Sequence, residues 1–74
     1  MTDLQITLRD YAKEDLEMLQ AEGAMAITNT KLGVLWLTVE DYVMIARDGL
    51  GNVLFQTAED NLMIAFIADN YITQ

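Results

Sequence analysis

Apolar residues recur at helical spacing through the first third of the chain. Five of them fall on one face of a helix that begins at Asp3: Leu4, Leu8, Ala12, Leu16 and Leu19. Thr2 and Gln5 form a capping-box pattern, and Gly23 is typical of the position just past a helix end. Residues 4–9 also alternate strictly between apolar and polar, which is the pattern of a strand. We favour the long helix, and a strand at 4–9 is the alternative.

Short runs rich in β-branched and aromatic residues follow the predicted helix. Residues 24–30 and 34–39 each predict a strand, with a turn at 31–33 between them. Residues 42–47 and 53–57 predict a hairpin, because Val, Ile and Tyr favour strands and the intervening Asp-Gly-Leu-Gly-Asn favours a loop. A helix over residues 39–48 is the alternative, since the apolar positions there also fit a helical face.

The last element is predicted to be a helix from Ala58 to about Ile72, capped by Thr57, with acids in its first turn. Residues 62–68 are seven apolar residues in a row, so every side of this helix needs cover. A sheet covers one side, and the other requires the N-terminal helix or a second subunit. We therefore expect a homodimer with an interface on this helix that includes Leu62, Met63, Phe66 and Ile67.

These elements predict an α+β fold in a single domain, residues 1–74. A small three- to four-stranded, mainly antiparallel sheet is packed by an N-terminal and a C-terminal helix. Trp36 is expected in the core, and Tyr11 and Tyr71 are expected to be partly exposed. Hydrophobic residues make up 53% of the 74-residue chain, which is more than so small a domain buries comfortably. The surplus apolar surface predicts a partner.

The composition argues against catalysis. The chain contains no His, Cys or Ser, which supply most acid–base and nucleophilic chemistry near neutral pH. Transition-metal sites also favour imidazole or thiolate ligands. The Gly49-Leu50-Gly51 segment has Leu54 where a dinucleotide-binding fingerprint has its third Gly. We predict a protein that is not an enzyme and has no cofactor or metal. A carboxylate enzyme is a third hypothesis, which requires a cleft lined by two or more acids.

Charge narrows the class of partner. Twelve acids against four bases give a net charge of −8, which repels nucleic acid and anionic lipid. The longest charge-free run is far shorter than the roughly 20 residues that span a bilayer, and the N-terminus lacks a secretory signal pattern. We expect a cytoplasmic protein that binds neither membrane nor nucleic acid directly, and whose partner is a protein with a basic surface.

Carboxylates gather on the face of the first helix opposite its apolar residues. At about 100° per residue, Asp3, Asp10, Glu14 and Glu17 form one stripe. A rigid row of carboxylates complements a basic groove built for phosphates. We predict that the partner-binding residues are those of the stripe together with nearby acids: Asp10, Glu14, Glu17, Glu40, Asp41, Glu59 and Asp60.

In size and charge the chain resembles small acidic inhibitors carried by phages and mobile elements. These include DNA-mimic, anti-restriction and anti-CRISPR proteins and inhibitors of uracil-DNA glycosylase. The resemblance implies a single α+β domain that blocks a nucleic-acid enzyme by charge and shape, and it assigns no residue a role. We predict a small acidic protein that inhibits or regulates a nucleic-acid-handling protein through a basic site. The alternative is a homodimeric structural or adaptor module whose charge serves solubility.

Overall fold

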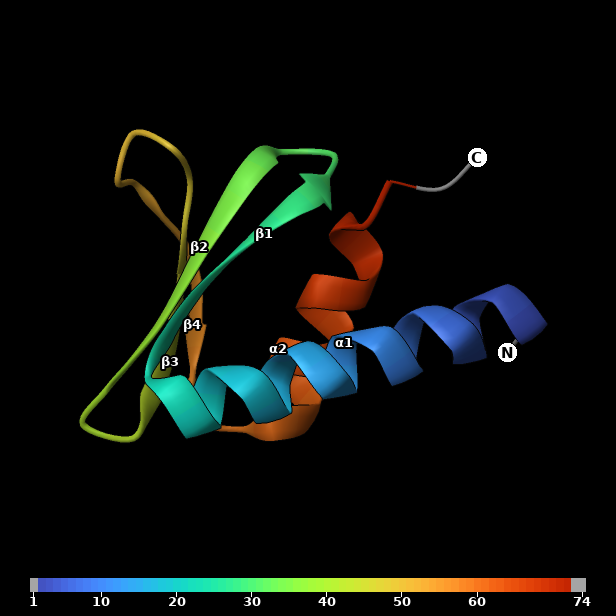
Figure 1. Cartoon of the computed structure of the whole chain (residues 1–74), viewed down its shortest axis with the longest axis horizontal. Helices are drawn as coiled ribbons and strands as arrows, with labels where there is room; N and C mark the ends of the chain where they lie inside the picture. Colours follow the sequence, from blue (N-terminus) through green and yellow to red (C-terminus); the bar gives the residue numbers. More distant parts are fainter. Residues whose placement is uncertain (1, 73–74) are drawn as a thin grey trace.

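The computed structural model describes residues 2–72 and contains two helices and one four-stranded sheet. In chain order the elements are α1 (Asp3–Glu22), β1 (Ala24–Thr30), β2 (Gly33–Glu40), β3 (Val43–Arg47), β4 (Val53–Thr57) and α2 (Asp60–Asn70). The strands are antiparallel and lie in the order β1-β2-β3-β4. Both helices lie on the same side of the sheet (Figure 1). The predicted α+β fold is confirmed, with four strands.

The ends of α1 are fixed by local hydrogen bonds. Gln5 N donates to Thr2 Oγ1 over 3.2 Å, and Thr2 N donates to Gln5 Oε1 over 2.8 Å, which completes the capping box. At the other end Gly23 adopts a φ of 83° and its N–H donates to the Leu19 carbonyl over 2.7 Å. The long helix is confirmed and the strand at 4–9 is wrong, because the two caps satisfy the free backbone groups at both ends of one continuous helix.

The predicted hairpin of residues 42–47 and 53–57 is confirmed, because β3 pairs antiparallel with β4, and the alternative helix at 39–48 is wrong. The connection from β2 to β3 is a two-residue turn of Asp41 and Tyr42, with φ values of 51° and 66°. Positive φ at both residues matches the twist of a tight antiparallel hairpin. Consequently β3 begins at Val43, and Tyr42 belongs to the turn rather than to the strand.

The C-terminal helix is shorter than predicted at both ends. Its N-cap is Glu59, and Thr57 Oγ1 instead accepts a hydrogen bond from Glu59 N over 3.1 Å in the preceding turn. The helix ends at Asn70 because Tyr71 is extended and bridges Thr30, while Ile72 N donates to Asn29 O over 2.9 Å. Within residues 2–72, neither helix has the length and apolar character needed to cross a bilayer.

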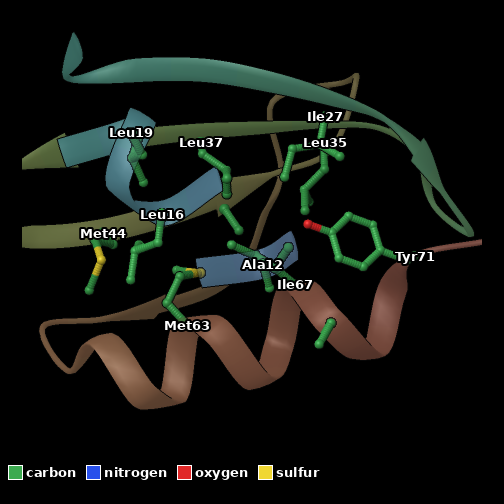
Figure 2. Packing of buried hydrophobic residues seen from close by; sticks show 12 residues of the cluster. Ala12, Leu16, Leu19, Ile27, Leu35, Leu37, Met44, Met63, Ile67 and Tyr71 are labelled. Carbon is green, nitrogen blue, oxygen red and sulfur yellow. The ribbon is translucent and has the colours of Figure 1, made fainter. Parts of the chain in front are cut away.

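The core lies between the helices and the inner face of the sheet (Figure 2). Along β2, Leu35 and Leu37 point inward and are fully buried, so Trp36 between them points outward and is 51% exposed. The expectation that Trp36 is a core residue is therefore wrong, because only one face of the sheet is covered by helices. We call the opposite side the outer face; its residues include Val34, Trp36, Thr38, Glu40, Ile45, Arg47 and Leu54.

The two predicted half-exposed tyrosines differ in outcome. Tyr11 is 57% exposed on α1, as expected. Tyr71 is only 3% exposed, which corrects the prediction, because the bridge to β1 draws its ring into the core beside Ile27 and Leu35 (Figure 2). A residue just past a helix end was thus buried by a strand-like contact with a distant part of the chain.

Candidate partner-binding surface

The structure places the predicted acidic stripe on the solvent side of α1. Ala12, Leu16 and Leu19 form the buried face of this helix. Asp3, Asp10, Glu14 and Glu17 are all exposed. The four carboxylates span 15 residues of helix, a rise of about 21 Å from the first to the last. We call these four residues the acidic stripe.

No ion pair neutralises the acidic stripe within residues 2–72. In the described part of the chain the ion pair present is Arg47–Glu40, with 3.3 Å between Nη2 and Oε2, and it lies on the outer face. Within residues 2–72 no three acidic side chains come close enough together to hold a metal ion. The stripe is thus an extended row of separate carboxylates rather than a compact chelating cluster.

An apolar ridge borders the acidic stripe, and sequence analysis did not identify it. Leu4, Tyr11 and Met18 are spaced seven residues apart and are 55%, 57% and 51% exposed. The helical periodicity predicts Leu4 on the buried face, but the first turns of α1 extend beyond the sheet (Figure 1), which leaves Leu4 uncovered. The seven-residue spacing was the available signal, because it keeps residues on one line along a helix.

The remaining predicted acids do not join the acidic stripe. Glu40 lies on the outer face in its ion pair with Arg47, and Asp41 lies in the turn after β2. Glu59 and Asp60 lie at the start of α2, where Asp60 Oδ1 accepts a hydrogen bond from Gln20 Nε2 over 3.0 Å. Gln20 is about 60° around α1 from Glu17, so Asp60 approaches α1 beside the stripe but not within it.

The interface predicted on α2 is largely used within the chain itself. Met63 and Ile67 are 0% exposed, so a second copy cannot reach them without unfolding, and their assignment to an interface is wrong. Phe66 is half-buried and stacks on Phe55 with ring centroids 4.8 Å apart. Leu62, 48% exposed, is the one residue of the four with a large accessible surface. The sheet and α1 together supply most of the cover that this apolar helix needs.

One hollow in the surface is lined by two acids, as the hypothesis of a carboxylate enzyme requires. Glu14 and Asp15 line an opening of about 370 Å³ beside Tyr71. The Tyr71 hydroxyl donates a hydrogen bond to Asp15 Oδ2. Burial, reinforced by this bond to Asp15, raises the pKa of Tyr71 well above its ordinary value. Because the Asp15 carboxylate accepts a hydrogen bond from the buried Tyr71, we interpret Asp15 and Tyr71 as a structural tie between α1 and the C-terminal segment.

No protein-family model matches the chain, and no curated protein or solved structure matches it either. Function is therefore inferred from the chain's own surfaces.

Proposed function

We propose that this protein is a small acidic inhibitor or regulator that acts in the cytoplasm on a nucleic-acid-handling protein. In this proposal the acidic stripe of α1 occupies a basic site that normally receives a phosphate backbone. The observation that carries the proposal is the stripe itself: four exposed carboxylates on one line of a 20-residue helix, without an ion pair in the described part of the chain.

The charge density of the acidic stripe is suited to such a site. One strand of duplex DNA presents a phosphate about every 3.4 Å of axis, so the stripe's length of about 21 Å corresponds to roughly six phosphates. Four carboxylates therefore provide about two-thirds of the charge of one strand over the same length. Charge complementarity of this kind favours fast association and makes affinity sensitive to salt.

The apolar ridge offers a partner apolar contact, which a phosphate backbone does not. Tyr and Met side chains are enriched at protein interfaces, where they add desolvated contact to charge. Tyr11 and Met18 lie alongside the acidic stripe and are each more than half exposed. A partner that contacts both features would bind the protein more tightly than charge alone allows, which is the requirement for an inhibitor that competes with nucleic acid.

The test uses a panel of purified nucleases, glycosylases, helicases and polymerases, each assayed on DNA or RNA with and without the protein. We expect inhibition of at least one enzyme. The triple variant Asp10→Lys, Glu14→Lys, Glu17→Lys should lose inhibition by about 100-fold or more, since each close charge pair contributes on the order of 1 kcal/mol or more at an interface. Inhibition by the unmodified protein should weaken as salt is raised.

The matched control is Glu22→Lys, Asp41→Lys, Glu59→Lys, which changes the net charge by the same amount at positions outside the acidic stripe. Because Asp41 and Glu59 are among the predicted partner-binding acids, this control also tests whether the binding site is confined to the stripe. It should retain most of the inhibition. Equal loss in both triple variants would show that overall charge rather than the stripe is responsible. A panel without any salt-sensitive inhibition would overturn the proposed function. Circular dichroism establishes that both variants keep the fold.

A further inference from the structure

The outer face is a surface of the molecule that the proposed function leaves unused. Both helices lie on the other side of the sheet (Figure 1). Trp36, which is the single Trp of the chain, is 51% exposed near the middle of this face. Val34 and Leu54 are 36% and 39% exposed. Half-exposed large apolar side chains on an uncovered sheet face are typical of an interaction surface.

Part of the outer face is already packed. Ile45 is only 9% exposed, yet it is not a member of the core cluster on the inner face. The strand register sets Ile45 between Thr38 on β2 and Gln56 on β4. Its burial on the side away from the helices shows that neighbouring side chains of the outer face cover it.

Charge identifies which kind of partner fits. The outer face holds one acid and one base, Glu40 and Arg47, and they pair with each other over 3.3 Å, while Arg47 Nη1 also donates to Thr38 Oγ1 over 3.0 Å. The other charged residues lie on the helices or in the connections between elements, and they carry the entire net charge of −8. A basic partner gains nothing from a neutral face. A second copy of this chain meets a charge-paired surface there, whereas at α1 it would meet four carboxylates of its own sign.

The size of the outer face fits a reversible association. Strands lie about 4.8 Å apart and residues rise about 3.3 Å, so four strands of this length form a face of roughly 19 by 20 Å, or about 400 Å² before side chains add relief. This is about half of the roughly 800 Å² per partner that a standard interface buries, so the association through this face is expected to be weak and transient. The edge strands β1 and β4 contain no charged residue, so no charged rim at these two edges opposes an approaching copy.

We propose that two copies of this protein associate through their outer faces, with Trp36 of each buried against the other. The arrangement is a two-fold symmetric, isologous dimer. It leaves the two acidic stripes on opposite sides of the assembly, where each remains free to bind a partner. The proposal is independent of the identity of that partner, because it concerns a different surface.

The unmodified protein provides the first test, because the fluorescence of Trp36 reports whether the outer face is covered. Light scattering and sedimentation are measured from nanomolar to millimolar concentration. We expect the mass to rise from 8.3 kDa to twice that value, and the Trp36 emission to shift to the blue and become less accessible to acrylamide over the same range. A chain that stays monomeric at every concentration, or a dimer in which Trp36 stays as accessible as in the monomer, overturns the proposal.

Two variants locate the interface. Leu54→Glu and Leu62→Glu each add one negative charge, at positions that are 39% and 48% exposed on the outer face and on α2 respectively. Leu54→Glu should lower the association constant by at least tenfold, and Leu62→Glu should leave it within twofold. The reverse result would place the interface on α2 and overturn the proposal. Thermal unfolding confirms that each variant is folded, and the Trp36 measurements on the unmodified protein need neither variant.

Discussion

The exposed side of α1 and the outer face of the sheet are both uncovered and both carry large apolar side chains, but they differ in charge. On α1 the apolar ridge lies beside four carboxylates without an ion pair among residues 2–72. On the outer face Trp36 lies near a single, internally neutralised ion pair. The acidic stripe thus holds four of the twelve acids of the chain on one line of α1, whereas the one acid and one base of the outer face pair with each other. This difference favours contact with a basic partner at α1 and contact with a second copy at the outer face.

The largest expected effect contrasts the two sides of β2. Leu37→Ala removes a fully buried side chain and should lower the free energy of unfolding by about 3 kcal/mol. Trp36→Ala, one residue away on the outer face, should cost about 1 kcal/mol or less in the monomer, because the ring is half exposed there. Urea unfolding at low protein concentration measures both. Comparable losses would mean that the outer face is part of the folding core rather than a surface.

This contrast also explains where prediction from sequence succeeded and where it failed. The capping pair Thr2 and Gln5, the stop at Gly23 and the turn-rich loop before β4 are local signals, and the elements that depend on them were predicted correctly. Trp36 and Tyr71 were misplaced because their burial depends on long-range packing: which face of the sheet the helices cover, and a bridge from Tyr71 to Thr30. Alternation along a strand gives two faces without saying which is inside.

The candidate surfaces also divide into those that local sequence pattern predicts and those that depend on long-range packing. The acidic stripe follows from helical periodicity alone, so it could be derived once α1 was assigned. The neutrality of the outer face could not, because Glu40 and Arg47 are seven residues apart and meet only through the β2–β3 register. Met63 and Ile67 were assigned to an interface because an apolar helix needs cover, and pattern alone does not say that α1 provides it.

A smaller effect separates Asp15 from the acidic stripe. Tyr71→Phe removes the hydrogen bond to Asp15 and should cost about 1–2 kcal/mol at neutral pH. Because folding raises the pKa of Tyr71, this residue's contribution is complete below its unfolded pKa of 10.0 and is lost as pH rises above it. From pH 7 to pH 11 the unmodified protein should therefore lose about 1 kcal/mol that the variant does not lose. Urea unfolding at the two pH values provides the comparison.

The control for this prediction is Tyr42→Phe, which removes a hydroxyl from a side chain that is 91% exposed. It should leave both the neutral-pH stability and the alkaline loss unchanged. If Tyr71→Phe showed the same alkaline loss as the unmodified protein, the tie between α1 and the C-terminal segment would not be the group that titrates. Partner binding through the acidic stripe should be the same in both variants, since neither changes its carboxylates.

The smallest expected effect concerns the turn that joins the two central strands of the outer face. Tyr42 has a φ of 66°, a conformation that costs a residue with a side chain about 1–2 kcal/mol and costs Gly little. Its ring is almost fully exposed, so Tyr42→Gly should raise the free energy of unfolding by about 0.5–1 kcal/mol after allowing for the extra entropy of an unfolded Gly. Tyr42→Phe keeps the strain and should not change stability. A loss of stability in Tyr42→Gly would show that the ring packs against its own chain. A gain would show that the fold does not require this aromatic residue. The association constant of Tyr42→Gly, measured by dilution, would then show whether the Tyr42 ring takes part in contact between two outer faces.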